Sequence, residues 1–567
     1  MTESKTAEHS AEHPEPKPIP TPDNFPIEWD DPEDSHLPLN QDRQHMPTPM
    51  TPLSGWLAHH HWGRGSSAGM AALDQPLMFH TRRVNTYYYM AVTPSIPMEQ
   101  MAEAGPKAEA GLKAALPVFA DRWNNEWLPE VRSYHDKWNA FDLPAATDSE
   151  LLEHLTWTTD TFARLWAIHM QLVLPALVGP SMLQDLYSDL IEDAEPMDVY
   201  KLTQGFDNNS LRAGEDLWKL SQTAAGSDEV KSTLASTPTG DVLAALEKSE
   251  EGKKLIAGIN AYAQAWGRRS DTVIEIGDPS WVENPSIVID ILKTYLKDES
   301  GDPREQWNEI VSERERLVSK ARDQISGYPE PVKQQFDMML AAGQAGHWIQ
   351  EDHNWWIDQQ GNHQVRQVFL EFGNRLAKAG VISVRDDVFM LTGDEIIESA
   401  KAGFTGDFKL EVLERRAEME KWAEIPAAAH IGTDYGPPPD NPITRALGRL
   451  FGWGPPPESV PSGTIAGRPG SSGKVTGTAR VIIKLSDAGR LNKGEILVTA
   501  TTSPPWTPLF ATAGGIVTDT GGALSHCAIV AREYGIPATV GAAGATFAIK
   551  DGDQIEVDGD AGTVRIL

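Results

Sequence analysis

Apolar residues recur at spacings of three and four positions along most of the segment 98–422. A repeat close to 3.6 residues predicts amphipathic helices that each bury one side. In the clearest stretch, 150–177, the apolar face consists of Leu151, Leu155, Phe162, Leu165, Ile168 and Leu172. The same pattern predicts further helices at 201–223, 240–266, 285–296, 304–327, 331–359 and 365–378.

The pattern changes at residue 463. From there to residue 567, short runs rich in Val, Ile and Thr alternate with glycine turns, as in 473–482, 495–499 and 554–557. Such runs predict strands, and helical pieces lie between them. The segment 463–567 is therefore expected to be a compact α/β domain beside a largely α-helical one.

Proline-rich segments suggest where the domains end. Residues 1–24 are rich in Pro and charge, which is typical of a disordered tail. Residues 40–78 combine many His, Pro, Gly and Trp and are expected to form an ordered loop. Two proline triplets in 430–462 predict a semi-rigid linker. The expected organisation is a disordered tail at 1–24, a mainly helical domain at 25–429, the linker at 430–462 and the α/β domain at 463–567.

Charge and composition exclude several classes of function. The net charge of −32 argues against binding to nucleic acid or to an anionic membrane surface, both of which need clustered Lys and Arg. The chain has one cysteine, Cys527, so no intrachain disulfide is possible and a reducing cytoplasm fits. No run of 18 apolar residues and no secretory signal pattern occurs, so neither a membrane span nor secretion is expected.

The strongest chemical signal is a histidine that follows a strand and a glycine pair. Residues 515–518 are expected to form the strand, and Gly521 and Gly522 allow a turn that side chains would hinder. Ser525 is a suitable N-cap, which places His526 in the first turn of a helix. Free N–H groups and the helix dipole favour a phosphate there, and an imidazole can accept a phosphoryl group. Arg532 lies in the same segment and is added to the catalytic candidates.

This segment, 518–538, together with 502–509, resembles the swivelling phosphohistidine domain of the phosphoenolpyruvate-utilising enzyme family. The resemblance covers 463–567 and is closest to the rifampin phosphotransferase branch, in which Leu-Ser-His is usual, and to the histidine-bearing subunit of phenylphosphate synthase. The chain departs from the dikinases, which tend to have Thr where Leu524 stands. Some relatives have a cysteine before the histidine, whereas Cys527 follows it here.

The resemblance implies that His526 is a relay: it must receive a phosphoryl group at one site (charging) and pass it on at another (discharging). The helical pattern of 98–422 does not fit the eight strand–helix repeats of a phosphoenolpyruvate-binding barrel. No Walker-type loop and no ATP-grasp-like segment is found. ATP and Mg²⁺ are therefore expected on a separate ATP-binding, ATP-grasp-like subunit, with no cofactor tightly bound to this chain.

The middle of the chain resembles the acceptor-binding part of rifampin phosphotransferase at 48–52, 204–210, 387–392 and Glu351. Candidates for acceptor binding or for the general base lie in one helix: His347, Trp348, Glu351, His353 and Trp355. His347 and Glu351 are one turn apart, and a His–Glu pair can hold a base in one tautomer. An ordinary amphipathic helix explains the same residues. Since His353 falls about 160° from Glu351 around the helix, no metal site is expected.

A second group of acceptor-site candidates lies in the expected loop and the segment after it. His59, His60 and His61 are flanked by tryptophans, and Arg83 could steady a phosphoryl group. A packed loop and an exposed arginine are the alternatives. The 18 tryptophans favour a small aromatic hydroxyl, such as a phenol, as the acceptor.

The sequence thus predicts a cytoplasmic phosphotransferase component that passes a phosphoryl group from ATP through His526 to a phenol-like acceptor. Two alternatives remain open at this stage. One is a phosphoenolpyruvate-dependent transferase, and the other is a non-catalytic phosphocarrier or regulatory module. The pattern does not select between the two ring nitrogens of His526 or between the β- and γ-phosphates of ATP.

Overall fold

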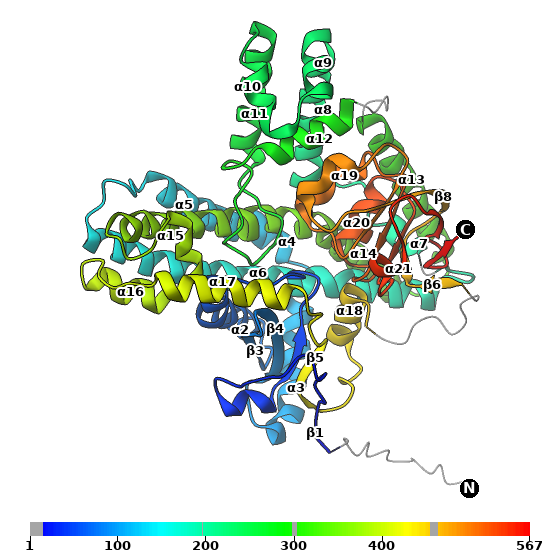
Figure 1. The fold of residues 1–567 in the computed structure, drawn as a ribbon. Helices are drawn as coiled ribbons and strands as arrows, with labels where there is room; N and C mark the ends of the chain where they lie inside the picture. Colours follow the sequence, from blue (N-terminus) through cyan, green and yellow to red (C-terminus); the bar gives the residue numbers. More distant parts are fainter. Residues whose placement is uncertain (1–14, 196, 297–302, 454–462) are drawn as a thin grey trace.

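The computed structural model describes residues 15–195, 197–296, 303–453 and 463–567. A helical body and a C-terminal α/β domain make up the molecule, and the α/β domain, coloured orange to red, lies against one side of the body (Figure 1). The multidomain fold class predicted from the sequence is confirmed.

The body is organised around one long helix, α6 (Asp148–Leu190). A capping box starts it: the Thr147 side chain accepts from the N–H of Glu150, and the Glu150 carboxylate accepts from the N–H of Thr147. The helices α14 (Glu330–His353) and α2 (Gly63–Ala71) pack along α6.

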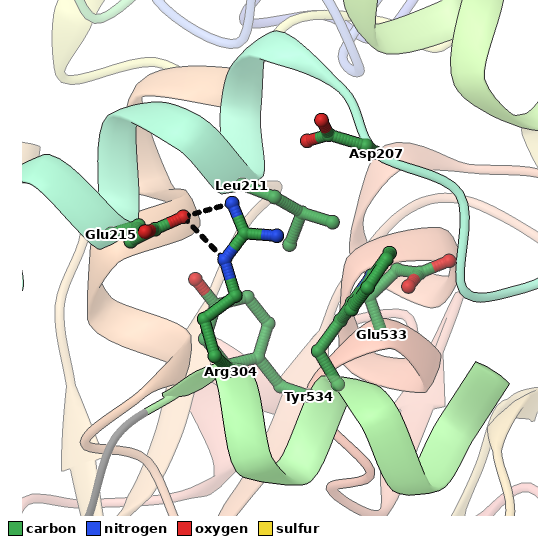
Figure 2. Close-up of a pocket in the computed structure, with 7 residues that line it drawn as sticks. Asp207, Leu211, Glu215, Arg304, Glu533 and Tyr534 are labelled. Atoms are coloured by element: carbon green, nitrogen blue, oxygen red, sulfur yellow. Dashed lines mark hydrogen bonds and ion pairs between the residues drawn. The ribbon is translucent and has the colours of Figure 1, made fainter. Parts of the chain in front are cut away.

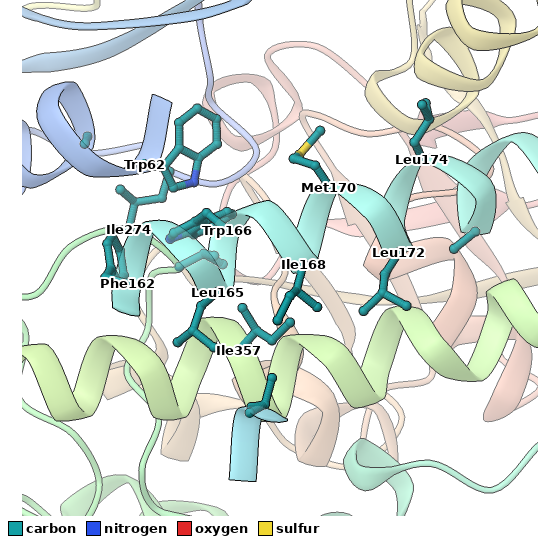
Figure 3. Packing of buried hydrophobic residues seen from close by; sticks show 14 of the residues in the cluster. Trp62, Phe162, Leu165, Trp166, Ile168, Met170, Leu172, Leu174, Ile274 and Ile357 are labelled. Atoms are coloured by element: carbon teal, nitrogen blue, oxygen red, sulfur yellow. The ribbon is translucent and has the colours of Figure 1, made fainter. Parts of the chain in front are cut away.

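Most apolar residues of α6 are buried in the protein core. By length and composition α6 is able to cross a membrane, but 78% of its most apolar window is buried inside the protein. Figure 3 shows Trp62 beside Trp166 on one side of α6, with ring centroids 5.1 Å apart, and Leu165 on the side that faces the helix carrying Ile357. Burial against both neighbours explains the apolar periodicity.

An antiparallel five-stranded sheet lies below the body in Figure 1 and has the order β1-β5-β2-β4-β3. Its strands are β1 (Lys17–Pro18), β2 (Pro38–Gln41), β3 (Leu77–Val84), β4 (Tyr87–Pro94) and β5 (His430–Asp434). Two strands fall in segments expected to be irregular: β1 in the tail 1–24 and β5 in the linker 430–462. Backbone pairing between distant segments, which local composition does not reveal, gives both their structure: β1 pairs with β5, and β5 also pairs with β2. Residues 1–14 and 454–462 of the two segments lie outside the described residues.

The expectation of a loop throughout 40–78 is wrong. Helix α1 (Pro52–Leu57), the π-helix η2 (Ala58–Trp62) and α2 follow one another there, and Thr51 caps the first of them. The small residues that resemble a loop are needed for packing. An added Cβ at Gly65 would lie 2.2 Å from the carbonyl oxygen of Ala163 in α6. Close helix contact therefore overrides the low helix propensity of glycine.

The α/β domain contains an eight-stranded mixed sheet with the order β6-β13-β12-β8-β9-β10-β11-β7. Strands β8 to β11 run parallel in the centre, and α20 (His526–Glu533) follows β10. The strands are β6 (Thr464–Ala466), β7 (Arg468–Ser471), β8 (Lys474–Val481), β9 (Ile496–Thr499), β10 (Gly515–Thr518), β11 (Ala538–Val540), β12 (Gln554–Asp558) and β13 (Thr563–Ile566). The strands predicted at 473–482, 495–499, 515–518 and 554–557 are confirmed.

The remaining helices complete the body, and α9, α10 and α11 project away from it (Figure 1). Most of the predicted helices are confirmed, but the one expected at 201–223 begins only at Asn209, and the one expected at 240–266 is divided into α10 and α11. The main ones are α3 (Met98–Ala115), α5 (Leu128–Ala140), α8 (Asn209–Ala225), α9 (Asp228–Ser236), α10 (Val242–Leu246), α11 (Glu250–Trp266), α12 (Ser286–Leu296), α13 (Pro303–Gln324), η5 (Asn354–Gln359), α15 (Gln360–Lys378), α16 (Gly393–Lys401), α17 (Lys409–Ala423) and α18 (Pro442–Phe451).

Candidate active site at the domain interface

His526 stands at the start of α20, as the sequence predicts. Ser525 is the N-cap and accepts a hydrogen bond from the N–H of Ala528. Gly521 has a φ of +96°, a conformation that favours glycine. A Cβ at Gly522 would lie 2.2 Å from the carbonyl oxygen of Arg449 in α18, so this turn is pressed against the helical body.

The His526 ring meets a carboxylate from the other domain. Its Nδ1 lies 3.1 Å from Oε1 of Glu351 in α14, and the Ser210 hydroxyl donates to Oε2 of Glu351 at 2.6 Å. Burial opposes ionisation of Glu351, but the charge of His526 and the hydrogen bonds from His526 and Ser210 outweigh it and hold its pKa below the usual value. An ionised carboxylate accepts a hydrogen bond from Nδ1–H. Nε2 of His526 is buried and has no hydrogen-bond partner among the described residues.

His347, one turn before Glu351, also contacts α20. Its Nε2 bonds to the carboxylate of Glu533, which also accepts from the N–H of Gly205 at 2.8 Å. The predicted shared face of His347 and Glu351 is correct, but the two side chains do not pair with each other. Each binds one residue of α20, so this face of α14 is a docking surface for the α/β domain.

A small cavity of about 40 Å³ continues this seam between α8, α13 and the end of α20. Figure 2 shows the Arg304–Glu215 ion pair with the Tyr534 ring beside Arg304, and Glu533 and Asp207 across from them. The helices α8 and α13 thus contribute to the interface together with α14 and α18.

A larger cavity of about 450 Å³ lies beside Asp352, the residue after Glu351. The N-terminus of α8 joins the two carboxylates: Ser210 bonds to Glu351, and the N–H of Asn209 donates to Asp352 at 2.8 Å. Burial raises the pKa of Asp352 to about 6. The residues lining the cavity are Asn124, Leu128, Arg132, Phe206, Asp207, Asn209, Arg212, Trp348, Asp352 and Trp356. The motif 204–210 was noted in the sequence, but the role of Ser210 beside Glu351 was missed.

The two predicted tryptophans separate. Trp348 lines the cavity with Asp352, whereas Trp355 packs against Trp266, with ring centroids 5.5 Å apart, and under Arg269. A regular α-helix would continue the face of Trp348 through Trp355. The π-helix η5 starts at Asn354 and shifts the register, so Trp356 lines the cavity instead. The prediction of Trp355 in the acceptor site is therefore not supported by its position.

Other predicted site residues also lie elsewhere. The hydrogen bonds and ring contacts of His59, His60 and His61 are with Trp56, Thr81, Arg64 and Arg82 on and around η2. Arg83 donates to the carbonyl oxygen of Met50. In the described residues these four side chains contact neither α14 nor α20. Nothing in the local sequence distinguishes three histidines on a π-helix from three histidines in a ligand-binding loop.

Arg532 is buried behind the glycine turn. It donates to the carbonyl oxygen of Ala523 at 2.7 Å and to that of Gly470 at 3.3 Å, and it stacks on Tyr200. Burial lowers the pKa of Arg532 to about 10. These contacts indicate that Arg532 holds the turn in place, and its role in catalysis stays a prediction.

Glu533 provides a first test of the docked arrangement. Replacing Glu533 with alanine leaves the N–H of Gly205 and the His347 ring without their partner at a buried interface, which we expect to cost roughly 1–3 kcal/mol. The expected result is a lower Tm and faster proteolysis of the full chain, with a smaller effect for Glu533→Gln because it keeps an acceptor for Gly205. An unchanged Tm and proteolysis rate in Glu533→Ala would contradict the docked interface.

Asp271 makes the stability of this interface depend on pH. Burial raises its pKa to about 6, against the N–H of Leu485 and the charge of Lys484 in the α/β domain. The folded protein therefore keeps a proton that the unfolded chain releases near pH 4. The contribution of this proton to the stability of the folded protein is complete below about pH 4. It declines as the pH rises to 6 and is absent above pH 6. We expect Asp271→Asn to raise the Tm by roughly 1–3 °C at pH 8 and to change it little at pH 4, as measured by thermal denaturation.

Two segments of the chain match known protein families. Residues 491–562 match the PEP-utilising enzyme mobile domain, and residues 169–351 match the fourth domain of rifampicin phosphotransferase. The first match includes His526, and the second includes Ser210, His347 and Glu351. The facing residues at the interface thus come from two domain types that occur in phosphotransferases.

Similar curated proteins are longer than this chain. Chondramide synthase of Chondromyces crocatus is 34% identical over 97% of this chain and 14% of its own length. Rifampicin phosphotransferase of Streptomyces sviceus is 26% identical over 84% of this chain and 52% of its own length. The prodigiosin synthesizing transferase of Serratia marcescens is 30% identical over 54% and 33%, respectively. The chain spans about half or less of each of these relatives.

Proposed function

We propose that this chain is a phosphotransferase component in which His526 carries a phosphoryl group from ATP to the hydroxyl of a small acceptor. Its C-terminal domain matches the mobile domain of the phosphoenolpyruvate-utilising enzymes. The observation that carries this proposal is the contact of 3.1 Å between Nδ1 of His526 and Glu351, which leaves Nε2 without a hydrogen-bond partner in the described part of the chain. We regard the docked arrangement as the discharging position of the relay.

The contact with Glu351 favours Nε2 as the phosphorylated nitrogen. Because the carboxylate accepts from Nδ1–H, the lone pair of His526 resides on Nε2. On discharge, the acceptor oxygen forms a bond to phosphorus while the Nε2–P bond breaks. The imidazole then leaves neutral and keeps its proton on Nδ1. Glu351 stabilises the positive charge that the phosphorylated ring carries before this step.

The cavity beside Asp352 is the proposed acceptor site. Trp348, Trp356 and Phe206 supply aromatic walls that suit a phenol-like ring. Asp352, with a pKa of about 6, is suited to take the proton of the hydroxyl near neutral pH. Two other predicted bases are occupied, since Glu351 holds His526 and His347 holds Glu533.

We further propose that charging takes place outside these 567 residues, in the cytoplasm. ATP and Mg²⁺ would bind to a separate ATP-grasp-like subunit, and the α/β domain would move to it on the segment that follows α18. Such a movement would break the hydrogen bonds from Gly522 and Leu524 to α18. The length of the relatives, which far exceeds the matched region, is consistent with further domains acting on the same relay.

The discharge step can be tested without the charging subunit. Phosphoramidate, a small reagent that phosphorylates imidazoles, is used to charge the full chain, and phenol or its saturated counterpart cyclohexanol is then added. We expect phenyl phosphate to form with loss of label from His526 and much less reaction with cyclohexanol, because a phenol loses its proton far more readily. Transfer to pyruvate would favour a phosphoenolpyruvate-dependent reaction. A label stable to every hydroxyl compound would favour a phosphocarrier.

A further inference from the structure

A second cluster of reactive side chains lies where α6 meets the end of α14, apart from the contact between His526 and Glu351. His169 comes from α6, His353 is the last residue of α14, and Asp358 lies in η5. One potential ligand atom of each lies within 4.8 Å of the other two. Nδ1 of His169 is 2.9 Å from Oδ1 of Asp358, and Nε2 of His353 is 3.7 Å from Oδ2.

The His353 ring presents a lone pair to this carboxylate. Its Nδ1 is 2.7 Å from the carbonyl oxygen of Ile349, which only accepts, so the ring proton resides on Nδ1. Nε2 lies 3.7 Å from Oδ2 of Asp358, which is too long for a hydrogen bond, so its lone pair is available to a cation held between the two atoms. A histidine that binds a metal through one ring nitrogen typically donates the N–H of the other to a carbonyl or carboxylate oxygen, as Nδ1 of His353 does here.

Asn354 adds an independent observation. Its Nδ2 donates to Oδ2 of Asp358 at 3.0 Å, which holds the amide beside the cluster. Its Oδ1 is buried and has no hydrogen-bond partner among the described residues, and only 8% of the residue is exposed. A buried amide oxygen without a partner is costly. The π-helical turn places Asn354 and Asp358 together, and such turns often occur at functional sites.

We propose that His169, His353 and Asp358 bind a divalent transition-metal ion of the Zn²⁺ type. Tetrahedral Zn²⁺ with bonds of about 2.0–2.1 Å has ligand atoms about 3.3 Å apart, and the distances of 2.9 and 3.7 Å lie on either side of this value. The fourth position is open to Asn354 Oδ1 or to water. Two imidazoles and one carboxylate suit Zn²⁺, Co²⁺ or Fe²⁺ rather than Mg²⁺ or Ca²⁺, which prefer oxygen ligands.

The ion would fasten α6 to α14 close to the docking surface. His353 is two residues beyond Glu351 on α14, and the charge of Glu351 reaches the His353 ring. The sequence predicted no metal because His353 and Glu351 point to different sides of the helix. The two side chains do point in different directions. His353, however, meets His169 of α6, which lies more than 180 residues earlier in the chain.

The test uses the full chain after removal of metals. Titration with Co²⁺ is expected to give one tight equivalent with the visible absorption of a four-coordinate ion, and Zn²⁺ should displace it and raise the Tm. Asp358→Asn and His353→Gln should each weaken binding by roughly 100-fold. A His60→Gln/His61→Gln variant removes two histidines of η2, one exposed and one half-buried, and should keep the tight equivalent.

Three results would overturn the metal site. They are the absence of a tight equivalent in the wild-type chain, equal affinity in Asp358→Asn, and loss of the equivalent in the His60→Gln/His61→Gln variant. The wild-type titration decides the matter even if a cluster variant fails to fold. Phosphorylation of His526 is measured separately, so failure of the metal site and failure of the proposed relay are distinguishable.

Discussion

Replacing His526 with asparagine should reduce phosphoryl transfer to a phenol by about 10⁴-fold or more, because the relay loses the only atom that accepts the phosphoryl group. Asparagine is polar, and its amide N–H can still donate to Glu351, so the domain interface is expected to persist. The measurement is the phosphate bound to the chain, recognised by its lability in acid and stability in base and assigned to a residue by mass spectrometry.

A matched control for this substitution is His430→Asn. His430 is exposed at the start of β5 and bonds to Asn40 in the five-stranded sheet, which is separate from the sheet of the α/β domain. Labelling and transfer should match those of the wild type in this variant. Product formation by His526→Asn at a rate near that of the wild type would refute the relay, whatever the acceptor.

Replacing Glu351 with glutamine should affect discharging and spare charging. The contact between Glu351 and His526 exists only when the α/β domain is docked on α14. A neutral amide holds the proton on Nδ1 less firmly than a carboxylate does, and a phosphorylated ring without that proton would have to leave as a poor leaving group, imidazolate, so we expect transfer to the acceptor to slow by about 100-fold. The measurement is the single-turnover decay of the phosphorylated chain in the presence of phenol, compared with the rate at which the label is first incorporated.

Glu330→Gln is the control for this variant, because Glu330 lies on the same helix and is exposed. It should leave both steps unchanged. If Glu351→Gln slowed charging and discharging equally, Glu351 would act on the fold of the protein. If it slowed neither step, the docked arrangement would not be the one in which the phosphoryl group is transferred.

Local signals were sufficient for the histidine segment. Strand 515–518, the turn at Gly521 and Gly522, the Ser525 cap and the helix that begins at His526 all depend on neighbours within a few residues. The side of α14 that carries His347 and Glu351 was likewise predictable, because helix periodicity depends on residues one turn apart. These features agree with the structure.

The predictions that differ from the structure concern contacts between distant segments. Strand β1 pairs with β5 across more than 400 residues, and β5 also pairs with β2 near the other end of the chain. The glycines of α2 resemble a loop until α6 is placed against them. Trp355 leaves the cavity because a π-helical turn changes the register after His353, and neither the insertion of this turn nor its position has a clear sequence signal.

The amino-acid sequence by itself determined the fold class, the family resemblance and the histidine that is proposed to carry phosphate, since each is encoded in short-range patterns. Only the tertiary structure decided which residue faces that histidine. Glu351 was a candidate base from the sequence, and its contact with His526 arises because α20 docks on α14. The same holds for His353 and His169, which the packing of α6 against α14 brings together. Side chains far apart in sequence meet only when burial of apolar surface fixes the relative positions of the helices that carry them.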